Sequence, residues 1–181
     1  QVSDTPTTGS YIAVAVGYDH TCALDTSGQI SCWGADDHLQ LSNAPSSGNF
    51  TKLVAGNYHT CGLSTAGGLT CWGDWADYGL DDSPSGTFTE VNAGSSYSCA
   101  VDTAGAITCW GRDYDGQIDD APTTGSFSAL GSGSRHSCAI ADSTGVLTCW
   151  GWDGYAGGIV SDTPSGSFVL VSGGLYHTCA V

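Results

Sequence analysis

A pair of cysteines recurs along the whole chain at a nearly constant period. The second cysteine follows the first after ten or eleven residues, and successive first cysteines lie 39, 38, 39 and 41 residues apart. The pairs are Cys22 and Cys32, Cys61 and Cys71, Cys99 and Cys109, and Cys138 and Cys149. Such self-similarity is typical of repeat architectures, in which each unit buries its apolar faces only against its neighbours. We therefore expect one repeat domain over residues 1–181.

Other residues recur at fixed places around each cysteine pair. Every unit has one proline, an aromatic residue two positions after a glycine, and another glycine five positions before the first cysteine. These landmarks predict four full units and a partial fifth, approximately residues 3–41, 42–81, 82–119, 120–160 and 161–181. Cys179 stands where a fifth pair would begin. We expect either that the chain continues beyond Val181, which is the preferred reading, or that a neighbouring copy completes the blade.

The residues around each cysteine pair alternate as in a β-hairpin. In the first unit, placing Cys22 opposite Cys32 also places Leu24 opposite Ile30 on the same face. Gly28 lies in the intervening turn, where glycine accommodates a positive φ. A non-hydrogen-bonded cross-strand pair brings Cα atoms to the ~4.4–6.8 Å that a disulfide needs, so we predict one disulfide in each hairpin. Zinc is the alternative, but one pair per hairpin leaves two ligand positions unfilled.

The composition favours an all-β fold. The chain has 27 glycines, a single glutamate and three basic residues, so good helix formers are scarce. We predict a β-propeller, or a segment of one, built from four-stranded blades of about 39 residues with one disulfide each. The alternative is a solenoid of similar units.

The charge of the chain excludes some partners. The formal net charge is −15, and Lys52, Arg112 and Arg135 are the only basic residues. A nucleic-acid or anionic-membrane surface needs more positive charge than three side chains supply, so we expect neither partner. No apolar run approaches the ~20 residues that a membrane-spanning helix needs. Dense, regular disulfides favour a secreted, extracellular or cell-surface location.

Two segments carry a family resemblance. "GYDHTCALDTSGQISCWG" (residues 17–34) and "CWGRDYDGQI" (residues 109–118) resemble the regulator-of-chromosome-condensation repeat, whose signature is G-x-x-H-t-x-a-L, a glycine-containing turn, and W-G-x-N-x-x-G-Q-L. The resemblance covers essentially the whole chain and implies a propeller, usually of seven blades with four strands each. The two-cysteine form is similar to repeats common in bacterial secreted and surface proteins.

The sequence departs from this pattern in two respects. Only the third unit keeps "GQI", whereas the others have "DHLQL", "DYGL" and "YAGGI". The acidic charge also speaks against the chromatin-bound, nucleotide-exchange member of the family. Secreted β-lactamase-inhibitor propellers share the fold, but their inhibitory loop residues have no match here.

The loops that follow each "CWG" differ between units, whereas the flanking residues recur. Variable loops on a repeated scaffold are where binding specificity usually lies, and these loops are rich in Asp and aromatic residues. Such loops suit a sugar, a protein partner or another copy of this chain; the alternative is that they only solubilise the fold. The candidate binding residues are Trp75, Tyr78, Tyr114, Trp152 and Tyr155.

Recurring histidines and tryptophans have a structural interpretation. A histidine lies two residues before the first cysteine in four units and is replaced by Tyr97 in the third. In a closed ring these histidines would surround the axis and suggest a metal, but the resemblance implies that each bonds the backbone of a neighbouring strand. The tryptophan of each "CWG" is interpreted as a blade-packing residue.

Two local motifs suggest ligands or modification. "DYDG", which contains Asp113 and Asp115, resembles the first half of a calcium loop but lacks further oxygen ligands at the usual spacing. We therefore expect no cofactor, with calcium near this pair as a weak alternative. Asn49 begins the sequon "NFT" and is a candidate glycosylation site.

No catalytic motif is present, so we expect a non-catalytic protein. The favoured hypothesis is a secreted structural unit of an extracellular assembly, a surface layer or filament, whose partners are further repeats or other copies. The alternative is an extracellular recognition module that binds a protein or glycan through the loops after each "CWG".

Overall fold

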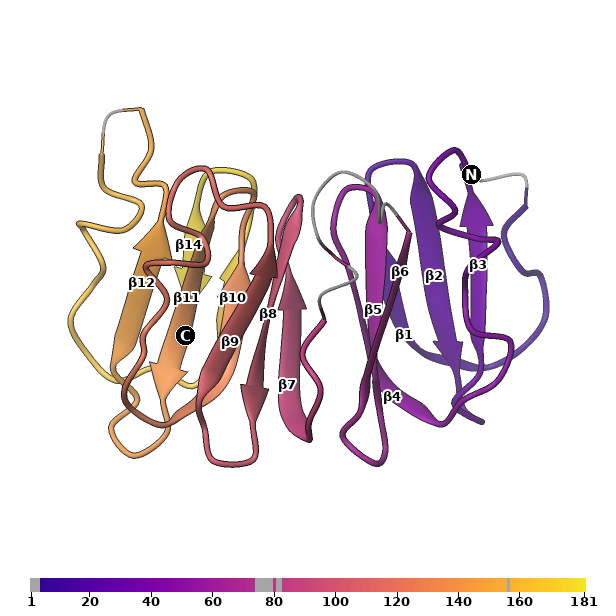
Figure 1. Cartoon of the computed structure of the whole chain (residues 1–181), viewed down its shortest axis with the longest axis horizontal. Coiled ribbons are helices and arrows are strands. Elements are labelled where there is room, and N and C mark those ends of the chain that lie inside the picture. Colours follow the sequence, from indigo (N-terminus) through magenta and orange to yellow (C-terminus); the bar gives the residue numbers. More distant parts are fainter. Residues whose placement is uncertain (1–3, 74–79, 81–82, 156) are drawn as a thin grey trace.

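The computed structural model describes residues 4–73, 80, 83–155 and 157–181, and these fold into a series of small antiparallel sheets (Figure 1). Each full unit forms a three-stranded sheet, and the fifth unit forms a two-stranded one. The strands are β1 (Tyr11–Val16), β2 (His20–Asp25), β3 (Ile30–Gly34), β4 (Phe50–Ala55), β5 (His59–Ser64), β6 (Leu69–Gly73), β7 (Phe88–Ala93), β8 (Tyr97–Asp102), β9 (Ile107–Gly111), β10 (Phe127–Ser132), β11 (His136–Ala141), β12 (Leu147–Gly151), β13 (Val171–Gly173) and β14 (Thr178–Ala180).

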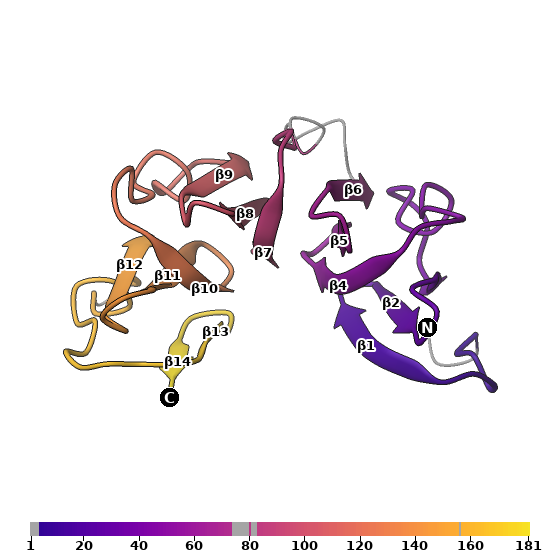
Figure 2. The ribbon, with the colours of Figure 1, turned by 90° about the horizontal axis from the view of Figure 1, so that it is seen from below.

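The sheets are blades arranged around a common axis. Figure 2 shows β1, β4, β7, β10 and β13 innermost, with the later strands of each unit farther out. The blades form an open arc whose gap lies between β1 and the sheet of β13 and β14. Within the described residues, no helix is long and apolar enough to cross a membrane. The propeller architecture predicted from the repeat is confirmed.

The hairpin register and the disulfides also agree with the prediction. Cys22 pairs with Cys32 in the ladder of β2 and β3, and Leu24 pairs with Ile30. All four predicted disulfides are present, with S–S distances of 2.02–2.10 Å and Cα–Cα distances of 4.0–4.1 Å. Cys179 is exposed in β14 and is the free cysteine of the described chain.

The number of strands differs from the four expected for each blade. The described full units have three strands each, and in the first, third and fourth units the segment after the third strand forms turns instead. In the first unit the Asp36 carboxylate accepts hydrogen bonds from the backbone amides of Leu41 (2.8 Å) and Ser42 (3.0 Å). Amides that bond a side chain cannot pair in a ladder, so the aspartate favours a folded loop over a fourth strand.

Neighbouring blades are joined by the recurring histidines. His20 Nε2 lies 2.8 Å from Thr60 Oγ1 in the next blade, and His59 Nε2 lies 2.9 Å from Ser98 Oγ. For His20 and His59 the partner in the next blade is therefore a side-chain hydroxyl and not backbone as expected, whereas His136 also bonds the backbone of His177. In the third blade, Tyr97 donates to the backbone oxygen of His136 at 2.5 Å. Burial lowers the pKa of His59 to about 4 and raises the pKa of Tyr97.

The core lies between successive blades. Leu53, Val91 and Leu130 occupy equivalent positions on the first strand of their blades, and all three are buried. The "CWG" tryptophans also reach the preceding blade, because Trp72 Nε1 donates to the backbone oxygen of Gln40 at 2.9 Å and Trp150 Nε1 to that of Gln117 at 2.9 Å. These contacts support the packing role expected for the tryptophans.

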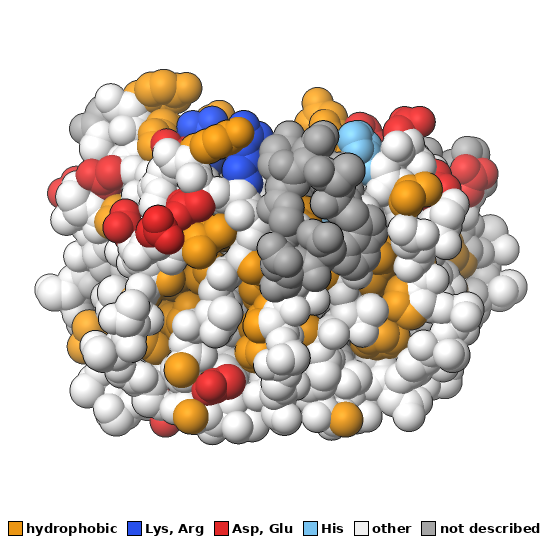
Figure 3. Space-filling model, viewed as in Figure 1, with side chains coloured by type: hydrophobic (Ala, Val, Ile, Leu, Met, Phe, Trp, Pro, Cys, Tyr) orange, Lys and Arg blue, Asp and Glu red, His pale blue; other side chains and the backbone are white. Residues whose placement is uncertain are grey.

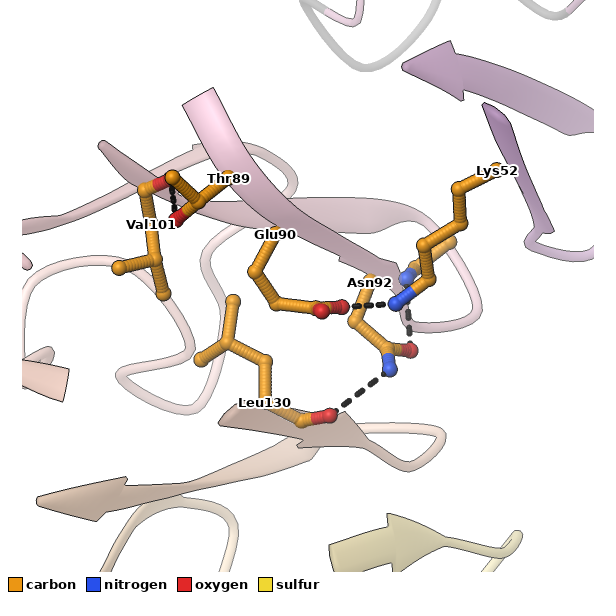
Figure 4. A network of polar contacts seen from close by, with 7 residues as sticks. Lys52, Thr89, Glu90, Asn92, Val101 and Leu130 are labelled. Carbon is orange, nitrogen blue, oxygen red and sulfur yellow. Dashed lines mark hydrogen bonds and ion pairs between the residues drawn. The ribbon is translucent and has the colours of Figure 1, made fainter. Parts of the chain in front are cut away.

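Polar side chains connect the innermost strands (Figure 4). Lys52 on β4 forms an ion pair with Glu90 on β7, and the Asn92 side-chain amide donates to the backbone oxygen of Leu130 on β10 at 3.0 Å. Burial lowers the pKa of Lys52 to about 8. Lys52 therefore forms a contact between blades on the innermost strands and does not belong to the loops at the ends of the blades.

Candidate binding face

Two sets of loops lie at the same end of the first, third and fourth blades. The turn between the first and second strands is hydrogen-bonded to the segment that follows the third, as in Arg112 N to Ser96 O (2.8 Å) and Trp152 N to Arg135 O (2.9 Å). These loops form what we call the loop face, at the top of Figure 1, made of residues 17–19, 35–41, 56–58, 94–96, 112–120, 133–135, 152–155 and 174–176. The opposite edge, the hairpin end, holds the β-turns at residues 26–28, 65–67, 103–105 and 142–145.

Aspartates hold the longer loops of this face in shape. The Asp153 carboxylate accepts hydrogen bonds from the backbone amides of Gly158 (3.1 Å), Val160 (2.6 Å) and Ser161 (2.8 Å). The amides of Ser161 and Val160 lower the pKa of Asp153 to about 2, so this carboxylate stays ionised at neutral pH. Asp113 plays the same part in the third unit, where it accepts from Ile118 and Asp119. The loops are thus preshaped by their own side chains.

Aromatic side chains gather on the loop face in two groups. In the first, the Trp152 ring lies 5.0 Å from that of Tyr155 and 5.5 Å from that of Tyr176, both in edge-to-face geometry. In the second, His38 stacks on Tyr58 at 4.4 Å and Tyr18 meets Tyr58 edge to face at 6.0 Å. Tyr155 is 96% exposed although it touches Trp152. Exposed aromatic groups of this kind are typical of binding surfaces.

Both arginines of the chain also lie on this face. The guanidinium of Arg112 lies over the Tyr114 ring, 3.7 Å from its centroid, and Arg135 Nη1 lies 3.2 Å from Asp115 Oδ2. The basic side chains visible in Figure 3 lie together at the upper edge, which is the loop face. Two of the three basic side chains of this acidic chain therefore lie on the loop face, and one of them contacts an aromatic ring.

The structure brings together only some of the predicted binding residues. Trp152 and Tyr155 are in contact, and Tyr114 lies in another blade against Arg112. Trp75 and Tyr78 lie outside the described residues.

Sequence reasoning considered only the loops after "CWG" and missed Tyr18, Tyr58, Arg135 and Tyr176. These lie in the turns between the first and second strands. The signal was present: the two residues after the recurring glycine read "YD", "NY", "SS", "SR" and "LY", whereas their neighbours hardly vary.

The structure shows where the suggested calcium site and the candidate glycosylation site lie. The carboxylate of Asp113 bonds its own loop amides and that of Asp115 pairs with Arg135. The calcium hypothesis stays an untested prediction. Asn49 is exposed near the hairpin end, where its backbone oxygen accepts from Thr65 N at 2.7 Å.

The recurring histidines do not line the axis. His20, His59 and His136 are buried between blades, and no group of three or more metal-ligating side chains that could hold an ion occurs in the part of the chain described. The axis at the loop face opens instead into a hollow of about 330 Å³ lined by the recurring glycines and their neighbours. There, backbone bonds pass from blade to blade, as from Tyr18 N to Asn57 O (3.0 Å) and from Asn57 N to Ser95 O (2.9 Å).

The blades, their disulfides and the variable loops define a disulfide-stapled β-propeller of repeated units. The family model for the regulator of chromosome condensation (RCC1) repeat matches residues 11–40, 50–79 and 88–117. The chain belongs to this repeat family. A comparison with curated protein sequences gave no match.

Solved structures with the same fold include receptor ectodomains and a yeast protein. The ectodomain of the receptor kinase CR4 from Physcomitrella patens is 26% identical with a TM-score of 0.80, and the match covers 97% of this chain and 48% of that one. The ectodomain of ACR4 from Arabidopsis thaliana is 25% identical with a TM-score of 0.76, covering 98% and 61%. Prp20p from Saccharomyces cerevisiae is 19% identical with a TM-score of 0.78, covering 98% and 57%. The chain thus spans between about half and three fifths of these proteins.

Proposed function

We propose that this chain is a non-catalytic extracellular recognition module that binds its partner through the loop face. The observation that carries the proposal is the distribution of exposed aromatic residues. Tyr18, Tyr114, Tyr155 and Tyr176 are all strongly exposed, and all four belong to the loop face. Tyr11 on β1 is the other exposed aromatic residue of the described chain, so four of the five lie on preshaped, variable loops, where binding residues are expected.

The extracellular location has two supports. One disulfide per full blade needs an oxidising compartment to form and persist. Two of the most similar structures are ectodomains of plant receptor kinases. Partner binding is also described for the fold: the structure of Prp20p was reported with its binding properties to Gsp1p and histones.

Glycan and peptide arrays test the proposal. Tyr155→Ala removes the most exposed aromatic ring of the loop face, and Val146→Ala, an exposed apolar residue near the hairpin end, is the matched control. We expect the wild-type protein and V146A to bind the same probes, and Y155A to lose signal. Probes that Y155A retains and V146A loses would contradict the proposal.

A specific observation favours a second function, the structural unit of an extracellular assembly. Val14 on β1 is equivalent to Leu53, Val91 and Leu130, yet it is 61% exposed whereas those three are buried against a preceding blade. The β1 face therefore has the same apolar character as the internal junctions and suits a further repeat unit or a second copy. Light scattering coupled to size-exclusion chromatography tests this function. Concentration-dependent polymers support it, and a monomer at all concentrations contradicts it.

A further inference from the structure

A small polar pocket opens on the loop face between the second, third and fourth blades. Its volume is about 190 Å³, and its lining includes Asn57, Ser96, Ser134 and both arginines. The lining residues come from the turns after β4, β7 and β10, from the start of β8 and from the loop after β9, so the pocket exists only where the blades meet. This volume holds one sugar ring or one side chain rather than an extended ligand.

Both arginines of the chain line this one pocket. The chain has three basic residues and a formal net charge of −15, and the third, Lys52, is engaged by Glu90 on the innermost strands. Arg112 and Arg135 are 23 positions apart in sequence and belong to different blades. Their meeting in one hollow is therefore a property of the fold.

Both side chains are positioned by fixed backbone. Arg112 N donates to Ser96 O at 2.8 Å, and Arg135 O accepts from Trp152 N at 2.9 Å. Cζ of the Arg112 guanidinium lies 3.7 Å from the centroid of the Tyr114 ring, and this cation–π contact holds the group against the ring. Positioned guanidinium groups lose little entropy on binding, and such preorganisation favours affinity.

The charges around the pocket favour a single anionic group. Asp115 contacts Nη1 of Arg135, but a guanidinium carries five N–H donors, so the contact leaves Arg135 able to bind a second carboxylate. The Asp113 carboxylate is turned to its own loop amides. The repulsion from more distant aspartates is screened over about 8 Å at physiological salt. These aspartates therefore repel a single carboxylate in the pocket less strongly than they repel a polyanion that extends across the surface.

The remaining lining residues favour a sugar over a peptide. They are serines, tyrosines and carboxamides, and none of the residues lining this pocket has an aliphatic side chain. Ser95 Oγ donates to Ser134 Oγ at 2.9 Å, which orients two hydroxyl groups at the inner wall. Hydroxyls and amides match the hydroxyl groups of a saccharide, whereas the apolar side chains of a peptide would find no counterpart.

We propose that this pocket binds the carboxylate-bearing unit of an acidic saccharide, with Arg112 and Arg135 on the carboxylate and the serine and asparagine side chains on the sugar hydroxyls. The proposal rests on the recognition function of the loop face and names the ligand class of one site on it. The carboxylate accepts hydrogen bonds from the N–H groups of both guanidinium groups, and a neutral sugar cannot form these charge-assisted bonds.

Nitrogen-15 NMR tests the proposal on the whole chain. The two arginines give two side-chain Nε–Hε signals, which Arg112→Gln and Arg135→Gln assign. The probes are sodium D-glucuronate, D-glucose as the neutral match, and N-acetyl-L-aspartate methylamide as an acidic peptide unit, all at constant ionic strength. We expect glucuronate to shift both arginine signals, with D-glucose and the peptide unit binding at least about tenfold more weakly. Each Gln variant should weaken glucuronate binding roughly tenfold, the worth of one charge-assisted contact.

Lys52→Gln is the matched control, because it removes the same charge from the innermost strands, and it should leave glucuronate binding unchanged. Backbone amide spectra report whether each variant is folded. If R135Q does not fold, Arg135→Lys, which keeps the charge, replaces it. Absence of arginine shifts with glucuronate, equal shifts with glucose, or tighter binding of the peptide unit would each overturn the proposal. Such a result would leave array binding that depends on Tyr155 unaffected. The arrays therefore distinguish a failure of this pocket from a failure of the whole loop face as a binding surface.

Discussion

Acidification should weaken this protein through the histidines buried between its blades. His59 is completely enclosed, and its Nε2 lies 2.9 Å from the Ser98 hydroxyl of the next blade. Burial, with a smaller effect from His20, lowers the pKa of His59 from 6.5 to about 4. The folded protein therefore holds His59 neutral, whereas the unfolded chain binds a proton below about pH 6.5. Stability is fully present above that pH and is lost as the pH falls toward about 4.

The size of the effect follows from the two pKa values. A lowering from 6.5 to about 4 corresponds to about 3 kcal/mol of unfolding free energy, because one pKa unit is worth about 1.4 kcal/mol. Between pH 7 and pH 5 the unfolded chain becomes protonated while the folded one does not, and the loss by pH 5 is about 2 kcal/mol. Burial lowers the pKa of His20 and of His136 too, so they add in the same direction.

Urea unfolding at pH 7 and pH 5, followed by tryptophan fluorescence, measures this loss. The matched variant is His59→Tyr, because Tyr97 fills the equivalent position of the third blade and stays neutral over this range. H59Y should lose about 2 kcal/mol less than the wild-type protein between the two pH values. An equal loss of unfolding free energy in both proteins would refute the reasoning, since it would show that proton uptake by His59 on unfolding does not cause the loss.

The other predictions concern the packing between blades and the disulfides within them. Val91→Ala should cost about 2 kcal/mol in thermal unfolding, and Val14→Ala under about 0.5, because Val91 is 0% exposed and Val14 is exposed at the equivalent position. Equal costs would contradict the core between blades. Replacing Cys61 and Cys71 together by serine should cost about 2–4 kcal/mol in urea unfolding, the worth of closing a short loop; an unchanged midpoint would contradict it. Gly56→Ala should cost about 1–3 kcal/mol, because its Cβ would overlap the His59 ring and the Gly94 carbonyl oxygen. A thermal midpoint equal to that of the wild-type protein would show that the junction can open to accept a methyl group.

The sequence was most informative where structure depends on residues close together in the chain. The register of Cys22 opposite Cys32 follows from strict alternation over a few residues, and the structure confirms it. The fourth strand was wrongly expected because nothing in the strand pattern shows that Asp36 bonds the amides of its own loop. The aspartate recurs two residues after the "CWG" glycine, as Asp113 and Asp153 do, and this was the available signal.

Contacts between units were harder to predict. That a histidine meets Thr60 of the next blade depends on how blades stack, and the period alone does not give that register. The pocket holding Arg112 and Arg135 combines residues of three blades and has no linear signature. Fold and disulfides therefore followed from local patterns, whereas the proposed binding face required the assembled arc.

Hydrogen–deuterium exchange in the presence of the strongest array probe tests the central claim, that recognition occurs on the loop face. We expect slower amide exchange at residues 17–19, 56–58, 133–135 and 152–155, and unchanged exchange at the hairpin turns 26–28 and 142–145. Protection confined to the hairpin turns would contradict the account.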